Sequence, residues 1–243
     1  MAKTHKQTSQ PAGQATTRPP AKRTRESRAD RQARAQRILH GLRKLYQTAE
    51  CALQHQSAYE LLVATILSAQ CTDERVNLVT PDFFRKYPDP PALAVASPDD
   101  VETLIRSTGF FRNKTKSLLG MSQVVCEEYN GQIPDTMDNL LTLPGVARKT
   151  ANCVLGTWYG KNEGIVVDTH VGRLALRLRL LTTARDDKDA VKIERDLMEL
   201  LPRDSWTYLA HALIWHGRRI CTARQPKCAE CELSGDCPSA GTC

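Results

Sequence analysis

The sequence Leu140-Leu-Thr-Leu-Pro-Gly-Val-Ala-Arg-Lys-Thr-Ala-Asn152 decides the fold, because it predicts two helices joined by a tight turn. Pro144 ends the first helix, since its ring fixes φ and removes the backbone N–H that a longer helix would need. Gly145 can adopt the positive φ that a turn between two helices demands. The segment is therefore predicted to be a helical hairpin.

The start of the second helix of this hairpin predicts a binding site for phosphate. The first N–H groups of a helix have no intrahelical partners and lie at the positive end of its dipole, where anions bind. Arg148 and Lys149 stand beside this position. Contacts to phosphate carry no base information, so the site suits DNA that is bound through its backbone. The hairpin alone leaves open whether Lys149 contacts phosphate or acts as a nucleophile.

Length and charge predict a folded region preceded by a basic tail. The chain has 243 residues, enough for one large or two small domains with a core. Residues 1–37 hold ten Lys or Arg and two acidic residues, whereas residues 38–243 hold 24 basic and 25 acidic residues. We expect residues 1–37 to be disordered, either as a non-specific DNA tether or as an inert extension.

No segment of the sequence predicts attachment to a membrane. The chain has no run of about 18 apolar residues and no signal peptide at its N-terminus. We therefore expect a cytoplasmic protein.

Helix signals recur from residue 38 to residue 220, and strand signals are almost absent. Ser57, Thr72 and Ser97 each predict the N-cap of a helix. The apolar run at residues 164–167 could form one strand, but it has no partner, and Asp168 after it resembles a further helix cap. The predicted fold class is all-α.

The C-terminal cysteines predict a metal site. Cys221, Cys228, Cys231 and Cys237 are spaced C-x6-C-x2-C-x5-C. Four thiolates on one short loop can bind tetrahedral zinc or a 4Fe-4S cluster, and the spacing alone leaves both open. Either metal would organise a segment that lacks a core of its own.

Lys149 and Asp168 together suggest catalysis. A lysine that has lost its proton is a nucleophile, and a nearby carboxylate can accept that proton or stabilise a developing cation. The alternative is that Lys149 contacts phosphate and Asp168 only caps a helix.

Several motifs stand in a characteristic order along the chain. They are Leu67–Asp73, Leu143–Asn152, Val167–His170, His216–Arg218 and the four spaced cysteines. These motifs resemble the endonuclease III family, whose members are helix–hairpin–helix DNA glycosylases with an iron–sulfur cluster. The resemblance covers about residues 38–238.

The resemblance implies a two-lobed, all-α helix–hairpin–helix glycosylase fold. Residues 53–161 would form a helical barrel domain, with the helix–hairpin–helix at about 136–160. Residues 38–52 and 162–243 would form the iron–sulfur domain, with a 4Fe-4S cluster on the four cysteines. Duplex DNA containing damaged pyrimidines or abasic sites would bind between the lobes of a monomer, on the bacterial nucleoid.

The resemblance also implies a reaction. A damaged pyrimidine would be flipped out of the duplex into a pocket. Lys149 would attack the sugar C1′, displace the base and form a Schiff base, and β-elimination would then cut the strand. Asp168 would take a proton or stabilise the sugar cation.

Further residues match positions that contact DNA in the family. Gln70 would fill the gap left by the flipped base, unless it is only a helix-end glutamine. Phe110 would be a second wedge, unless it is a core aromatic, and Asp73 would line the pocket. The residues for which the resemblance implies DNA contact are Gln70, Phe110, Arg112, Leu143, Gly145, Ala147, Arg148, Thr150 and His170.

Two positions depart from the family pattern. Ala147 stands where the family usually has a second glycine, and its methyl group is expected to weaken phosphate binding. Arg112 follows two phenylalanines where smaller or uncharged residues are common, which could change substrate choice or affinity.

Two other functions compete with this interpretation. A monofunctional mismatch glycosylase of the same fold would lack the lysine at position 149, and the adenine-specific type would carry a further C-terminal domain. A non-catalytic DNA-binding module with structural zinc is the other alternative.

Overall fold

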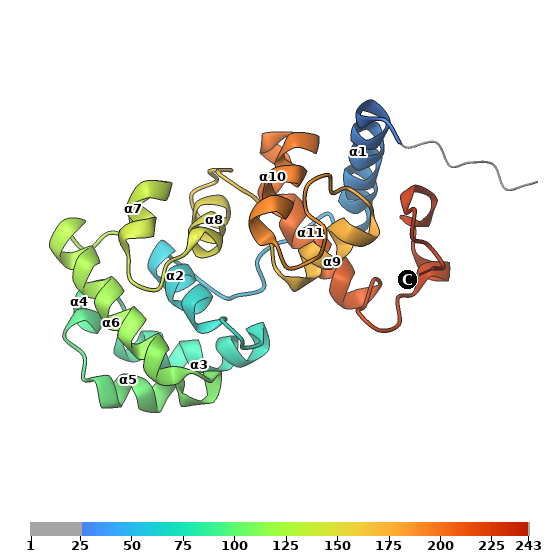
Figure 1. The fold of residues 1–243 in the computed structure, drawn as a ribbon. Coiled ribbons are helices and arrows are strands. Elements are labelled where there is room, and N and C mark those ends of the chain that lie inside the picture. The colour runs from blue at the N-terminus through green and yellow to red at the C-terminus, as the bar shows by residue number, and fades with distance from the viewer. Residues whose placement is uncertain (1–25, 243) are drawn as a thin grey trace, which may run out of the picture.

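The computed structural model describes residues 26–242, and every regular element in this range is a helix (Figure 1). The all-α prediction is confirmed, and residues 164–167 form no strand there. The α-helices are α1 (Arg28–Leu45), α2 (Ala58–Leu67), α3 (Asp73–Lys86), α4 (Pro90–Ala94), α5 (Pro98–Ile105), α6 (Phe111–Glu128), α7 (Met137–Thr142), α8 (Arg148–Thr157), α9 (Thr169–Arg177), α10 (Ala190–Leu200) and α11 (Trp206–Arg219). Short 3₁₀-helices lie at η1 (Arg106–Thr108), η2 (Arg203–Ser205), η3 (Cys228–Glu230) and η4 (Ser234–Asp236). No helix of the described range is long and apolar enough to cross a membrane.

The first helix corrects the predicted boundary of the basic tail. Residues 1–25 lie outside the described residues, but the prediction of disorder is wrong for residues 28–37, which form the start of α1. Ser27 caps this helix by accepting the Asp30 N–H at 3.1 Å. Arg34 is buried and donates to the Leu178 carbonyl at 2.6 Å. Counting charges missed the helix because a long basic side chain can cover apolar surface while its charge finds polar partners.

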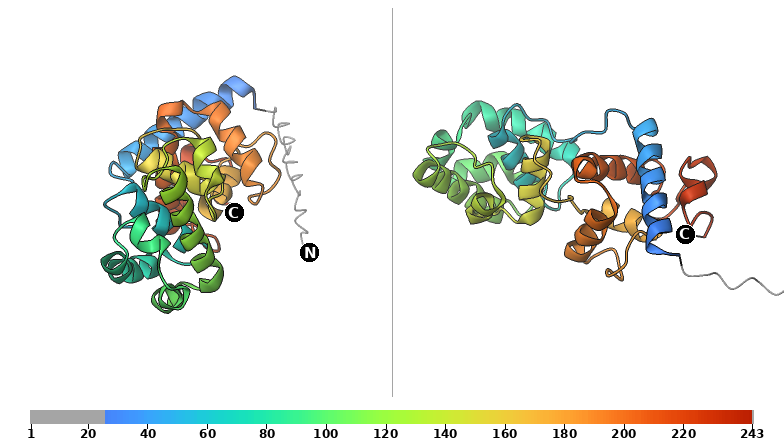
Figure 2. Two further views of the ribbon diagram at one scale, coloured as in Figure 1. Left: turned by 90° about the vertical axis from the view of Figure 1, so that its left-hand side faces the viewer. Right: turned by 90° about the horizontal axis from the view of Figure 1, so that it is seen from above.

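The helices form two lobes, each around its own hydrophobic core (Figures 1 and 2). One core gathers residues of α2–α8, including the fully buried Phe83, Leu118 and Leu155. The other gathers residues of α1, α9, α10 and α11 together with Leu233 of the cysteine loop. The N-terminal helix therefore packs with the C-terminal part of the chain, and the polypeptide crosses between the lobes before α2 and after α8.

Ser57 and Thr72 cap helices where the sequence predicts them, and Thr136 caps a further helix, whereas Ser97 precedes α5 without forming the predicted side-chain cap. The side chains of Ser57, Thr72 and Thr136 accept N–H groups of Glu60, Arg75 and Asn139, respectively. Such caps satisfy donors that the helix itself leaves without partners. They fix where α2, α3 and α7 begin; α3 starts with Asp73, and α7 leads into the hairpin before α8.

Candidate active site

The loop Leu143–Ala147 joins α7 to α8 and forms the predicted hairpin. Gly145 has a φ of +79°, a conformation that side chains other than glycine rarely adopt. A Cβ atom at Gly145 would also lie 2.5 Å from the Cβ of Ser117 on α6. Position 145 therefore needs glycine both for its backbone conformation and for its packing. The Val146 N–H closes the turn by donating to the Leu143 carbonyl at 3.1 Å.

Ala147 is the N-cap residue of α8, with φ −98° and ψ 170°. This is extended backbone that any residue adopts, so the chain conformation does not require glycine at position 147. No side chain caps α8. Arg148 and Lys149 are exposed at its first turn and Thr150 is half-buried, which leaves the start of α8 accessible to an anion.

A cavity between the two lobes brings Lys149 and Asp168 together. Its empty volume, which includes space open to solvent, is about 620 Å³. Lys149 comes from α8 and Asp168 from the residue before α9. The other lining residues come from the segment before α2, from α2, α3, α8 and α11 and from the segment before α9; they are Glu50, Cys51, Ala52, Leu53, Thr65, Ser68, Asp73, Cys153, Val166, His211, Ile214, Trp215 and Arg218.

Asp168 caps α9 with one of its two carboxylate oxygens. Oδ1 accepts the N–H groups of His170 at 2.9 Å and Val171 at 2.8 Å. Among the hydrogen bonds of residues 26–242, none goes to Oδ2. The cap predicted from the sequence is therefore present, and the second oxygen is available for a substrate.

Asp73 and Arg218 form an ion pair in the wall of the same cavity. The Arg218 Nη2 lies 2.6 Å from the Asp73 Oδ2. Asp73 begins α3 in one lobe and Arg218 lies near the end of α11 in the other. This pair places a carboxylate and a guanidinium in the cavity wall, where both groups can form hydrogen bonds with a base.

Arg148 points toward the other lobe and pairs with Glu194 of α10. Its Nε lies 2.9 Å from the Glu194 Oε2, and this hydrogen bond raises the pKa of Arg148. Asn152, one turn further along α8, donates to the Glu194 Oε1 at 2.8 Å. The guanidinium of Arg148, which was predicted to contact DNA, thus pairs with Glu194. No side chain caps α8, so the backbone N–H of Arg148 in its first turn is not bound by a capping side chain.

Gln70 and Phe110 lie on two exposed loops and share an unusual backbone conformation. Their φ angles are +54° and +48°. Phe110 is 61% exposed, so the alternative of a core aromatic is wrong. Arg112, whose side chain is 81% exposed, lies over the ring of Phe111 and 4.0 Å from Glu102.

His170 lies in the first turn of α9, beside the cavity and not among its lining residues. Its Nδ1 is 3.1 Å from the Arg173 Nη2, and a Cβ on Gly217 would approach the same nitrogen to 2.9 Å. Burial lowers the pKa of His170.

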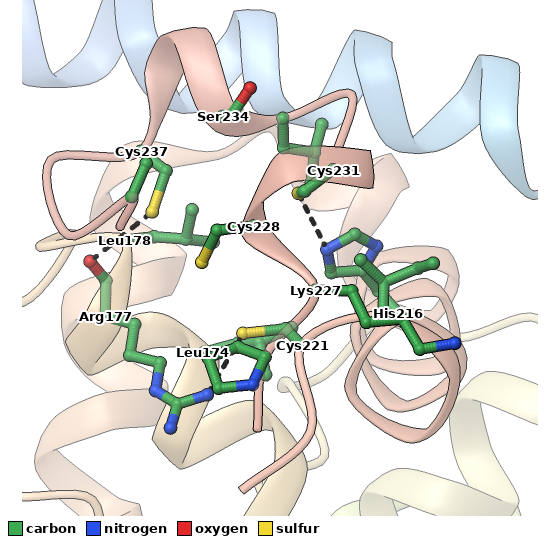
Figure 3. Close-up of a pocket in the computed structure, with 14 residues that line it drawn as sticks. Leu174, Arg177, Leu178, His216, Cys221, Lys227, Cys228, Cys231, Ser234 and Cys237 are labelled. Carbon is green, nitrogen blue, oxygen red and sulfur yellow. Dashed lines mark hydrogen bonds between the residues drawn. The ribbon is translucent and has the colours of Figure 1, made fainter. Parts of the chain in front are cut away.

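The four spaced cysteines surround one apolar space (Figure 3). Cys221 and Cys231 each lie against a polar neighbour, with the Arg177 Nη1 3.3 Å from the first sulfur and the His216 Nε2 3.5 Å from the second. The remaining wall includes the apolar side chains of Leu174, Leu178, Ile220, Pro226 and Leu233. Four sulfur donors in an apolar pocket fit an iron–sulfur cluster, whose ligands are thiolates.

Some residues of the site could not be found from the sequence. His211 on α11 is buried beneath the cavity, where burial lowers its pKa to about 4. Cys51 and Cys153 also line the cavity, and Glu194 binds Arg148 at the start of α8. None of these residues stands in a motif; Cys153 lies one turn after Lys149 on α8, whereas tertiary packing brings His211 and Cys51 to the cavity.

Comparison with known proteins agrees with this geometry. Residues 63–203 match the HhH-GPD superfamily of base excision DNA repair proteins, and residues 221–237 match the iron–sulfur binding domain of endonuclease III. Endonuclease III of Synechocystis sp. is 52% identical over 87% of this chain and 95% of its own length. Endonuclease III of Escherichia coli K12 is 34% identical over 82% of this chain and 92% of its own length.

Solved structures show the same similarity. A trapped endonuclease III–DNA covalent intermediate matches with a TM-score of 0.80 and 36% identity, covering 86% of this chain and 96% of that one. A thermostable thymine-DNA glycosylase, with 21% identity and a TM-score of 0.76, shares the fold. Because relatives of this similarity align along most of the chain, the protein belongs to the endonuclease III family: it is a base excision repair DNA glycosylase and AP lyase that carries a 4Fe-4S cluster.

Proposed function

We propose that the protein removes oxidised pyrimidines from duplex DNA and then cleaves the abasic strand through a Schiff base on Lys149. One observation carries this proposal: Lys149 and Asp168, from the two different lobes, line a single cavity. A lysine that served only as a phosphate contact would not need to face an interlobe cavity with a carboxylate. A monofunctional mismatch glycosylase is disfavoured because it would lack this lysine.

The reaction begins with the flipped base in the cavity. Asp168 accepts a proton from the Lys149 ammonium through Oδ2, the oxygen that α9 leaves available. The Lys149 Nζ then attacks the sugar C1′ while the bond from C1′ to the base breaks, and the base leaves with the proton that Asp168 accepted, which restores the Asp168 carboxylate. The resulting amine opens the sugar ring and becomes a Schiff base.

Strand cleavage follows from the Schiff base. Loss of a proton from the sugar C2′ allows the 3′ phosphate to leave by β-elimination, because the iminium nitrogen accepts the electron pair. Hydrolysis then releases Lys149. In both steps the carboxylate of Asp168 stabilises the positive charge that develops on the sugar or on the nitrogen.

The exposed loops around the cavity serve to bind and distort the duplex. The backbone N–H groups at the start of α8, from Ala147 to Thr150, would hold phosphate, with Leu143 and Gly145 shaping the turn. Gln70 would occupy the gap left by the flipped base, and Phe110 would wedge beside it. Arg112 and His170 would contact the neighbouring strand. A similar endonuclease III has been solved in a non-covalent complex with DNA, which supports this arrangement.

The proposal also assigns a role to each of two domains and names the cysteine ligands of the cluster. Residues 53–161 form the barrel domain, and the preceding helix with residues 162–243 forms the iron–sulfur domain. The ligands of the cluster are Cys221, Cys228, Cys231 and Cys237. The cluster fixes the loop that follows α11, while the surrounding apolar side chains keep water from the sulfurs. The enzyme acts as a monomer on DNA of the bacterial nucleoid in the cytoplasm.

Borohydride trapping tests the function. Wild-type protein mixed with duplex DNA containing an abasic site is expected to give a covalent complex after reduction, because borohydride fixes the Schiff base. Lys149→Ala should trap none, whereas Lys161→Ala, which removes an exposed lysine beyond the end of α8, should trap as wild type does. A wild-type protein that binds abasic DNA and traps nothing would contradict the proposal.

A further inference from the structure

Lys114 is a buried lysine that joins the ends of two helices. Its side chain is 5% exposed. The ammonium donates to the Leu67 carbonyl at 2.7 Å and to the Thr108 carbonyl at 2.8 Å. Leu67 is the last residue of α2, and Thr108 is the last residue of η1. Terminal carbonyls of helices have no intrahelical partners, so one ammonium satisfies an acceptor at each helix end.

Each of these helix ends leads directly into a loop with a positive φ. Gln70 follows Leu67 by three residues, and Phe110 follows Thr108 by two. The left-handed conformation costs a non-glycine residue about 1 kcal/mol, and it persists only where the surroundings hold it. Lys114 contributes a further restraint, because its own backbone N–H donates to the Phe110 carbonyl at 3.1 Å.

Stability gives a poor explanation for a lysine at this position. No carboxylate forms an ion pair with it among residues 26–242, and burial lowers its pKa. Burying an ammonium without an anionic partner is costly, and an apolar side chain of similar length is often as stable or more stable. The stability of the fold therefore does not explain the lysine. Its geometry does, because one ammonium binds the helix ends that lead into both loops.

We propose that Lys114 is a positioning residue, which sets the loops of Gln70 and Phe110 relative to each other so that both side chains enter the duplex together. The inference rests on the proposed function, in which these two side chains replace the flipped base and wedge beside it. Lys114 itself touches no DNA, because it is enclosed by the barrel lobe. Its effect is therefore on opening the duplex and not on the chemistry at the sugar.

Lys114→Met separates these two effects. Single-turnover release of an oxidised pyrimidine from duplex DNA is expected to slow about tenfold, since small misplacement of positioning groups is costly. Cleavage of a preformed abasic site, which has no base to flip, should change less than about twofold. Lys86→Met removes a surface lysine of the same lobe and should leave both rates at the wild-type value. Equal slowing of both reactions by Lys114→Met would overturn the proposal.

A mutant cycle tests whether Lys114 acts through Gln70 and Phe110. In a Gln70→Ala, Phe110→Ala background, Lys114→Met should slow base release by less than about twofold, because the groups that it positions are absent. A further tenfold loss in that background would show that Lys114 acts elsewhere. If Lys114→Met fails to fold, Lys114→Gln serves in both comparisons, because its NH₂ group is a polar donor on a side chain too short to reach as the ammonium does.

A third measurement is independent of catalysis. Binding of Lys149→Ala enzyme to duplex DNA with 2-aminopurine opposite an abasic site should change the fluorescence as the loops enter the helix. Adding Lys114→Met should reduce that change by about half or more. An unchanged signal would refute the positioning role. A wild-type enzyme that shows the fluorescence change without releasing oxidised pyrimidines would instead refute the proposed function and leave the positioning role standing.

Discussion

Glu194 holds Arg148 across the boundary between the two lobes, at 2.9 Å between Oε2 and Nε. The other carboxylate oxygen accepts from Asn152, so both oxygens of Glu194 bind α8. Gly164 packs against the same group, since a Cβ there would lie 2.0 Å from the Glu194 Oε1. The helix that carries Lys149 is thereby fixed against the lobe that carries Asp168.

Glu194→Ala should destabilise the protein by about 2–3 kcal/mol, because it leaves the buried amide of Asn152 without its acceptor and removes the partner of Arg148. Urea unfolding of the cluster-containing protein measures the change. Glu163→Ala is the matched control, since Glu163 pairs with Arg203 on the surface, and such pairs contribute less than about 1 kcal/mol. Equal losses in the two variants would show that the contact between the lobes adds nothing.

Asp168→Asn should separate capping from chemistry. Asparagine caps helices about as well as aspartate, so the free energy of unfolding should change by less than about 0.5 kcal/mol. The amide cannot accept the proton of Lys149, so base release should slow about a hundredfold or more. Thermal unfolding and single-turnover kinetics on one preparation provide both values. Near-normal base release would assign Asp168 to capping alone.

Gly145→Ala and Ala147→Gly should behave differently although both change one methyl group. The first forces alanine into a positive φ and against Ser117, which should cost about 2 kcal/mol or more and weaken DNA binding. The second changes a residue with extended backbone, so DNA affinity should shift by less than about twofold. Fluorescence anisotropy with abasic duplex measures both. Several-fold tighter binding by Ala147→Gly would show that the methyl group does displace phosphate.

His211 should make the stability depend on pH between about 6.5 and 4. Burial lowers its pKa from 6.5 to about 4, so the unfolded chain binds a proton first as the pH falls. The stability is therefore complete above pH 6.5 and is lost on acidification, by about 2 kcal/mol between pH 7 and pH 5. In urea unfolding, the free energy of unfolding of His211→Asn should fall by about 2 kcal/mol less than that of the wild type between pH 7 and pH 5. An identical pH dependence in the two proteins would show that His211 does not titrate in this way.

Local sequence chemistry predicted much of the fold. The positive φ of Gly145, the cap at Asp168 and the starts of α2 and α3 all depend on a few neighbouring residues. The resemblance to a family then placed Lys149 and Asp168 in one site, which their spacing along the chain could not do.

Side chains whose partners lie far along the chain could not be placed in this way. Nothing in the sequence singles out Lys114, whereas the structure buries it against Leu67 and Thr108. The sequence also contained no sign that Arg148, predicted to contact DNA, pairs with Glu194. Arg34 belonged to a presumed tail and instead binds the Leu178 carbonyl. In each case tertiary packing determines the partner of the long side chain, and charge and periodicity are insensitive to tertiary packing.

The position of α1 determines when each lobe can be completed during synthesis. Its apolar residues Ile38, Leu39 and Leu42 pack with α9–α11, which are translated only after the whole of the other lobe. At about 5–20 residues per second, α1 waits on the order of ten seconds for its partners. The lobe of α2–α8 can assemble during this delay, whereas the apolar face of α1 remains exposed to chaperones until α9–α11 have been synthesised.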